Sequence, residues 1–126
     1  NYDADSIAAS EAALEKAGLA PNLMVDCSHA NSAKDPARQP LVLDDMIGQI
    51  EAGNRSIIGA MIESHIGFGN QSLSVGKENL AYGVSVTDGC IDWETTERAL
   101  RDAAARLRTL LAERVASQPE GTRQAG

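Results

Sequence analysis

Two short apolar runs, each followed at once by polar side chains, constrain the fold of this chain more than any other feature. The first run is Leu23-Met24-Val25, and the second covers residues 57–62 (IIGAMI). Neither run alternates between apolar and polar residues, which is typical of strands buried on both faces of a parallel sheet. A helical pattern precedes each run, and this helix–strand–helix–strand order is that of βα units. The sequence therefore predicts an α/β fold with parallel strands alternating with helices.

Three amphipathic segments are predicted to be helices. The first covers 4–17, with Asp3 as its N-cap and Gly18 just beyond its end. The second covers roughly 40–52, and the third covers about 93–115 after the N-cap Asp92. The side chains expected to face inward are Leu43, Met46, Ile47 and Ile50 in the second helix, and Leu100, Leu107, Leu110, Leu111 and Val115 in the third.

The segment between the second strand and the last helix lacks this regularity. Residues 66–83 are rich in glycine and polar side chains, and a stretch of this length inside a compact domain is usually functional or disordered. A weaker, alternating strand is predicted over 84–87, and it delivers Asp88. The region up to residue 116 is expected to form one folded segment, and the polar tail over 117–126 is expected to be flexible.

Composition and charge exclude several classes of partner. The net charge is −7, whereas binding to a nucleic-acid backbone requires clustered Lys and Arg, so no nucleic acid is expected. The longest apolar runs are well short of the ~18 residues that a membrane span needs, so no membrane partner is expected. The two cysteines, Cys27 and Cys90, are too few for a disulfide scaffold and favour a reduced, cytoplasmic protein. Aromatic residues make up only 3%, and the first residue is Asn1 rather than Met, so we expect a piece of something larger.

Polar side chains at the ends of the three predicted strands are the candidates for chemistry. In parallel α/β proteins, working residues lie just past the carboxyl ends of strands. His29, Glu63 and Asp88 lie at such positions, and an imidazole with two carboxylates suits a divalent cation of the Mn, Fe, Co or Zn type. Each of them could instead cap the next helix, but three compatible groups on successive strand ends favour a metal site. His65 competes for the same role, because it shares a strand face with Glu63.

Other polar residues carry weaker signals. Cys90 lies two residues after Asp88, but a small buried side chain is the simpler interpretation. Lys34 and Lys77 could contact an anionic substrate, although solvated surface lysines are more common. The GFGN stretch over 67–70 is interpreted as a loop rather than a phosphate cradle, because no helix pattern follows it.

Several segments together resemble one enzyme family, the type I, microbial 3-deoxy-7-phosphoheptulonate synthases (DAHP synthases). The resemblance runs from Asn1 to about Arg114, in order and at the spacing of the family. The segments that carry it are DCSHANS (26–32), IIG (57–59) with MIESH (61–65), GNQ (69–71), and LAYG (80–83) with SVTD (85–88).

The resemblance implies a fold, a reaction and a ligand set. Family members are (β/α)8 TIM barrels that condense phosphoenolpyruvate with erythrose 4-phosphate and release phosphate, the first step of the shikimate pathway. Their divalent metal is held by a Cys, a His, a Glu and an Asp, and the last three fall on His29, Glu63 and Asp88. His29 is also the residue that we assign as catalytic. Neither Cys27 nor Cys90 occupies the position of the family's cysteine ligand.

The resemblance also places this chain within the family enzyme. It corresponds to the C-terminal part of the barrel, so the expected partners are the two substrates, the missing N-terminal part of the barrel and a second copy in a homo-oligomer. The segment alone is expected to be inactive. The alternative is a stand-alone, non-catalytic α/β module that binds a metal or a partner protein. An open reading frame that continues upstream of Asn1 would favour the synthase over this alternative.

Overall fold

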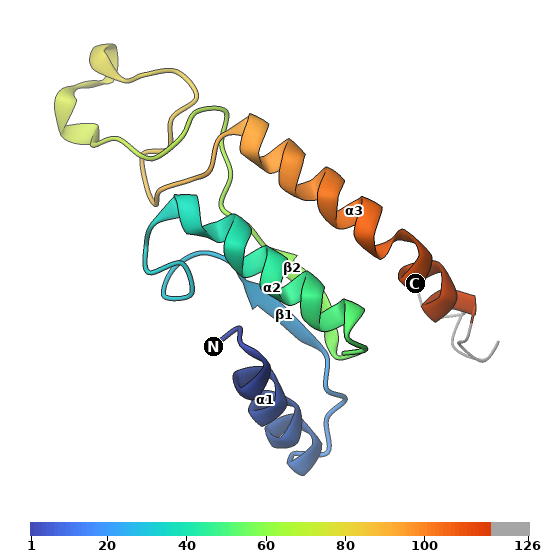
Figure 1. Ribbon diagram of the computed structural model, residues 1–126. Helices are drawn as coiled ribbons and strands as arrows, with labels where there is room; N and C mark the ends of the chain where they lie inside the picture. The colour runs from blue at the N-terminus through green and yellow to red at the C-terminus, as the bar shows by residue number, and fades with distance from the viewer. Residues whose placement is uncertain (117–126) are drawn as a thin grey trace, which may run out of the picture.

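The computed structural model describes residues 1–116, in which helices and parallel strands alternate (Figure 1). The predicted flexible tail over 117–126 lies outside the described residues. The order of the main elements is the predicted one, and each predicted boundary agrees within one or two residues. The elements are α1 (Ala4–Lys16), β1 (Leu23–Asp26), α2 (Gln39–Glu51), β2 (Ile57–Met61) and α3 (Trp93–Ala116), with short 3-10 turns η1 (Pro36–Arg38), η2 (Leu73–Val75) and η3 (Lys77–Asn79).

Local sequence signals explain where α1 begins and ends. The Asp3 side chain accepts a hydrogen bond from the backbone N–H of Ser6 at 3.0 Å, which satisfies one of the free donors of the first turn. Gly18 follows the helix with φ at +73°, a left-handed conformation that glycine adopts without steric cost. Both of the predicted boundary residues therefore act as expected.

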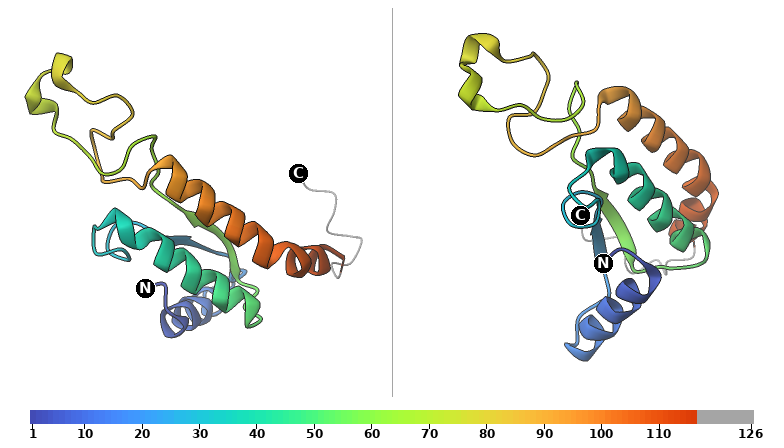
Figure 2. Two further views of the ribbon diagram at one scale, coloured as in Figure 1. Left: turned by 45° about the horizontal axis from the view of Figure 1, so that its top comes forward. Right: turned by 60° about the vertical axis from the view of Figure 1, so that its left-hand side comes forward.

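The two strands pair in parallel, and α2 and α3 lie on the same side of them (Figure 2). Val25 pairs with Ala60, and Asp26 pairs with Met61 at the carboxyl ends of the strands. The apolar side chains that form the core share almost complete burial. They are Ile7, Val25, Cys27, Val42, Leu43, Met46, Ile47, Ile50, Ile57 and Leu107. All four predicted inward residues of α2 are in this core, so that prediction is confirmed.

The prediction for the inward face of α3 was wrong in part. Leu107 is buried and Leu110 is partly buried, but three of the predicted residues, Leu100, Leu111 and Val115, are exposed. Among the described residues, α3 packs chiefly against α2, and one neighbouring helix covers only a narrow stripe of it. No helix in the described region is long and apolar enough to cross a membrane.

The segment over 66–92 leaves the body of the fold as a long loop and returns to it before α3 (Figures 1 and 2). The predicted strand over 84–87 does not form. Ser85 instead makes one isolated bridge with Asn70, and the Asn70 side chain donates to the carbonyl of Thr87 at 2.8 Å. A strand needs a neighbouring strand to satisfy its backbone groups, and no described strand extends beside this segment. The alternating pattern was therefore not enough to define a strand.

Candidate metal centre

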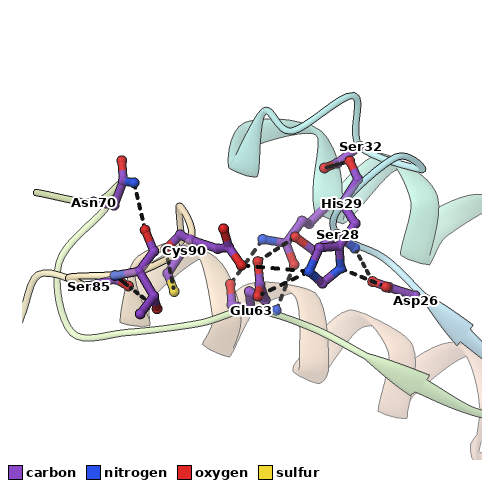
Figure 3. A network of polar contacts seen from close by, with 11 residues as sticks. Asp26, Ser28, His29, Ser32, Glu63, Asn70, Ser85 and Cys90 are labelled. Carbon is purple, nitrogen blue, oxygen red and sulfur yellow. Dashed lines mark hydrogen bonds and ion pairs between the residues drawn. The ribbon is translucent and has the colours of Figure 1, made fainter.

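The side chains of His29 and Glu63 face each other at the carboxyl ends of the two strands (Figure 3). The Asp88 carboxylate joins them in one cluster. His29 Nε2 lies 3.7 Å from Glu63 Oε1 and 3.8 Å from Asp88 Oδ2. One possible ligand atom from each residue lies within 4.8 Å of the other two. The three residues that the sequence singles out therefore come together from positions up to 59 residues apart in the chain.

A different backbone segment positions each of the three side chains. His29 follows β1 in a tight loop, where its φ is +51°. Glu63 lies two residues beyond β2, and its carbonyl oxygen accepts a hydrogen bond from the backbone N–H of Ile91 at 3.0 Å. Asp88 lies in the loop over 66–92, two residues before Cys90. The backbone of Cys90 exchanges two hydrogen bonds with that of Gly69. Two local backbone pairings thus bring Asp88 to the strand ends.

A carboxylate fixes the orientation of the His29 ring. Asp26 Oδ2 lies 2.7 Å from His29 Nδ1, and this contact leaves Nε2 facing Glu63 and Asp88. The hydrogen bond with Asp26 is the main cause that raises the pKa of His29, with smaller contributions from the charges of Glu63 and Asp88. Histidines that bind metals commonly donate their other ring N–H to a carboxylate, which fixes the tautomer and strengthens the ligand. The Asp26–His29 pair has this arrangement.

Glu63 is held at its side chain and at its backbone. The Ser28 hydroxyl donates to Glu63 Oε2 at 2.6 Å, so Oε1 is the oxygen that faces His29. The side-chain amide of Gln39 accepts from the Glu63 N–H at 2.8 Å and donates to the Glu63 carbonyl at 3.0 Å. Ser28 and Gln39 are both buried. The Glu63 carboxylate therefore approaches the centre in one defined orientation.

The three side chains line a small open cavity. Its volume is about 130 Å³, and its remaining lining residues are Ser28, Lys34 and Gly89. A larger groove of about 350 Å³ lies between α2 and α3, but its floor is mainly apolar, and none of the three side chains reaches it. The donor chemistry rather than the cavity size therefore makes this cluster the candidate site.

Other candidates from the sequence lie outside the cluster. His65 is exposed, and its Nδ1 accepts a hydrogen bond from the N–H of Ile66. Cys27 is fully buried, and burial raises the pKa of its thiol to about 11. Burial also raises the pKa of Cys90, which is close enough to Glu63 and Asp88 for their charges to contribute. Lys77 lies on η3 in the loop over 66–92, away from the cavity lining.

Sequence reasoning did not assign the residues that orient the ligands. Asp26 precedes His29 by three residues in the predicted turn, so its proximity was a usable signal. Ser28 and Gln39 had no such signal, because serine and glutamine are ordinary in loops and at helix starts. Only the packing of α2 on the strand ends brings Gln39 to Glu63.

The donor set suits a divalent metal ion. A neutral imidazole and two carboxylates match Mn, Fe, Co or Zn better than Ca or Mg, which prefer all-oxygen sites. The two carboxylates supply negative charge. Asp26 binds Nδ1 of His29, and Ser28 binds Oε2 of Glu63, so the other nitrogen and the other oxygen face the cluster. The residues present therefore fit the metal that the family resemblance implies.

Comparison with known proteins shows which family this chain resembles. The profile of the DAHP synthetase I family matches residues 1–101. The Tyr-sensitive phospho-2-dehydro-3-deoxyheptonate aldolase of Enterobacter agglomerans is 51% identical over 118 residues, which cover 94% of this chain and 55% of that relative. The Tyr-sensitive enzyme of Escherichia coli K12 is 53% identical over 116 residues, covering 92% of this chain and 33% of that enzyme.

A solved structure agrees with the sequence comparison. The phospho-2-dehydro-3-deoxyheptonate aldolase of Francisella tularensis SCHU S4 superposes with a TM-score of 0.79 at 40% identity, over 86% of this chain and 31% of that one. The chain thus spans about half the length of one relative and about a third of the others. From the family match and these identities, this chain belongs to the DAHP synthetase I family.

Proposed function

We propose that this chain carries the metal-binding part of a 3-deoxy-7-phosphoheptulonate synthase. This transferase condenses phosphoenolpyruvate with erythrose 4-phosphate and releases phosphate, at the start of aromatic amino-acid biosynthesis. The observation that carries the proposal is the convergence of His29, Glu63 and Asp88 within 4.8 Å in a chain of this family. The Asp26 carboxylate at His29 Nδ1 supports the proposal further, because histidines that bind metals commonly donate their other ring N–H to a carboxylate.

The proposed setting is a (β/α)8 barrel. Two parallel strands with α2 between them form one βα unit, which is the repeating element of that barrel. The site lies at the carboxyl ends of the strands, where barrel enzymes bind their substrates. We propose that other segments of the same barrel complete the fold, and that the whole protein is a cytoplasmic homo-oligomer. The C-terminal placement of this segment stays a prediction.

In this proposal His29 Nε2, Glu63 and Asp88 hold the divalent metal. The metal supplies Lewis acidity toward the aldehyde oxygen of erythrose 4-phosphate, which makes the aldehyde carbon open to attack. His29, the proposed catalytic residue, is neutral in this state, and Asp26 keeps its Nδ1 protonated and its ring in place. The fourth ligand of the family, a cysteine, is proposed to come from another segment of the protein, because neither Cys27 nor Cys90 occupies the position of that cysteine.

The negative charges around the cavity support a role for a cation in the proposed reaction. Both substrates are anions, and Asp26, Glu63 and Asp88 would repel them at short range. Lys34 is the single basic residue among the cavity-lining residues. A divalent cation held by these carboxylates would offset their charge, and Lys34 would contact a phosphate or carboxylate of a bound substrate.

The test compares ligand substitutions with a substitution of the neighbouring histidine, in the complete polypeptide that carries this chain. We expect H29A, E63A and D88A each to abolish the metal-dependent condensation and to lower the bound metal. H65A is the control, because His65 lies outside the cluster, and it should retain most of the activity. The measurements are product formation and metal content by elemental analysis. Near-normal activity and metal content in D88A would disprove the ligand assignment.

A further inference from the structure

Gln39 is a fully buried polar side chain that contacts the backbone of a proposed metal ligand. It is the first residue of α2 and has 0% of its surface exposed. Its side-chain oxygen accepts from the Glu63 N–H at 2.8 Å, and its side-chain nitrogen donates to the Glu63 carbonyl at 3.0 Å. Both ends of one amide group therefore bind both backbone polar groups of a single residue, 24 positions further along the chain.

These two hydrogen bonds take the place of a neighbouring strand for Glu63, which lies beyond the end of β2. β2 ends at Met61, so its ladder with β1 does not extend to Glu63. A backbone N–H or carbonyl that is buried needs a partner, and the amide of Gln39 offers the same donor and acceptor as a peptide group. The N–H of Ile91 gives the Glu63 carbonyl a second donor at 3.0 Å. These three hydrogen bonds thus hold the backbone of Glu63 two residues beyond the end of β2.

The position of the Glu63 carboxylate depends on this backbone. The Ser28 hydroxyl binds Oε2, and Oε1 faces His29 Nε2 at 3.7 Å. Ser28 itself is fixed by its N–H, which donates to Asp26 Oδ1 at 2.8 Å. A small rotation of the Glu63 backbone would carry the carboxylate away from both Ser28 and His29, because only two methylene groups separate the backbone from the carboxylate carbon.

We propose that Gln39 is a positioning residue of the metal centre, which acts through the Glu63 backbone to hold the carboxylate at the ligand position. The inference rests on the proposed metal-binding function. It assigns to the start of α2 a role in metal affinity, although no Gln39 atom contacts the three ligating groups. Residues that orient ligands in this way typically change metal affinity by about 10–100-fold when they are replaced.

Two substitutions at Gln39 separate positioning from ordinary packing. Q39M keeps the length of the side chain and removes both hydrogen bonds. Q39E keeps the length and the acceptor, but it replaces the donor with an oxygen that faces the Glu63 carbonyl. We expect both variants of the complete polypeptide to bind Mn²⁺ about 10–100-fold more weakly than the wild type, measured by calorimetry. With Co²⁺ as the probe, the visible absorption spectrum should also change, because it reports ligand geometry.

Gln49 provides a matched control on the same helix. Its side-chain nitrogen donates to the Tyr2 carbonyl at 2.7 Å and to Asp45 Oδ1 at 2.6 Å, so Q49M also removes two hydrogen bonds. Neither of these partners belongs to the metal centre. We expect Q49M to lower the melting temperature of the metal-free protein while leaving the Mn²⁺ affinity and the Co²⁺ spectrum unchanged.

The possible outcomes distinguish this inference from the proposed function. If the wild type binds no Mn²⁺, the proposed function itself fails. If the wild type binds Mn²⁺, and Q39M and Q39E bind it as tightly as Q49M does, Gln39 has no positioning role. Failure of both Gln39 variants to fold, with Q49M folded, also overturns the inference, because Gln39 would then be needed for folding in general.

Discussion

His29 belongs to a loop whose backbone is strained next to the metal centre. Its φ is +51°, and Ala33 and Lys34 have φ of +55° and +61°, although none of the three is glycine. Left-handed backbone at such residues costs on the order of 1 kcal/mol each, so the surrounding contacts must maintain it. The N–H of Lys34 donates to the His29 carbonyl at 2.7 Å, which closes the loop. This tight turn brings both His29 and Lys34 to the cavity.

The contact between Asp26 and His29 predicts how metal binding depends on pH. Asp26 raises the pKa of His29 in the metal-free protein, so a proton competes with the metal for His29 as the pH falls. Metal affinity should therefore be highest in the neutral to alkaline range and should fall in acid. D26N should lower the pKa of His29 toward its ordinary value, and at alkaline pH it should weaken metal binding by about 10–100-fold. NMR titration of the His29 ring and calorimetry measure the two effects.

D45N is the control for D26N. Asp45 is an exposed carboxylate on α2 that binds Gln49, so its loss changes the net charge equally without touching the centre. An unchanged pKa of His29 in D26N would show that the 2.7 Å contact does not govern the imidazole.

At the scale of elements, α2 and α3 differ in how much of their apolar surface the described chain buries. Five apolar residues of α2 are buried, whereas Leu107 is the only buried leucine of α3. Arg106 joins the two helices, with its guanidinium 2.5 Å from Asp44 Oδ1 and 2.6 Å from Glu51 Oε2. Ion pairs and a narrow apolar stripe therefore attach α3, while α2 is embedded in the core.

Two leucines one turn apart on α3 test this difference. Leu107 is 8% exposed and Leu111 is 46% exposed. L107A should lower the free energy of unfolding by about 2–5 kcal/mol, because it leaves a cavity against the core. L111A, which removes the same atoms from a largely exposed site, should change it by no more than about 0.5 kcal/mol. Urea unfolding of a sample with defined assembly state measures both, and equal losses would contradict the described packing.

The N-cap of α1 predicts an acid-sensitive helix end. Hydrogen bonds from Ser6 lower the pKa of Asp3, so its stabilising contribution is complete at neutral pH. As the pH falls below about 4, this contribution is lost by protonation of the carboxylate. D3N keeps an N-cap acceptor that does not titrate.

We expect the start of α1 to fray in acid in the wild type and to be less sensitive in D3N, as followed by the Ser6 amide resonance in NMR. Glu11 acts in the same direction, because hydrogen bonds from Ser56 and Asn54 lower its pKa. D3N should therefore remove part of the acid response and leave the part that belongs to Glu11. An identical response in both proteins would show that Asp3 does not cap the helix in solution.

At the scale of the whole molecule, one face of the sheet lacks a cover within the described residues. Val25 and Ile57 point into the core, whereas their neighbours Met24 and Ile58 are 70% and 65% exposed. Adjacent strand residues point to opposite faces, so Met24 and Ile58 mark the face away from α2. In the proposed barrel, other segments of the same barrel would cover this face.

This exposed face predicts the behaviour of the chain produced alone. We expect it to self-associate, to bind Mn²⁺ weakly and to form no product, because open strand edges and apolar faces attract partners. Light scattering during gel filtration and an activity assay measure these properties. A double substitution of Met24 and Ile58 by lysine should reduce the self-association. A stable 13.3 kDa monomer that converts both substrates would contradict the expectation.

The local elements of this protein could be predicted from the sequence because their signals are local. Asp3 and Gly18 define the ends of α1 through short-range hydrogen bonds and backbone preferences. The apolar runs predicted β1 and β2, and the polar residues after them predicted the cluster of His29, Glu63 and Asp88. The position of such residues at strand ends follows from chain order alone, because parallel strands end at the same edge of the sheet.

Tertiary structure decided everything that depends on a neighbour distant in sequence. The alternating segment over 84–87 forms no strand because no described strand pairs with it, and Leu111 is exposed because no described element covers it. The partnership of Gln39 with Glu63 exists only because α2 packs across the strand ends. Periodicity in a sequence reports which faces can be buried, but burial and hydrogen bonding require a partner, and the partner's position is a property of the folded chain.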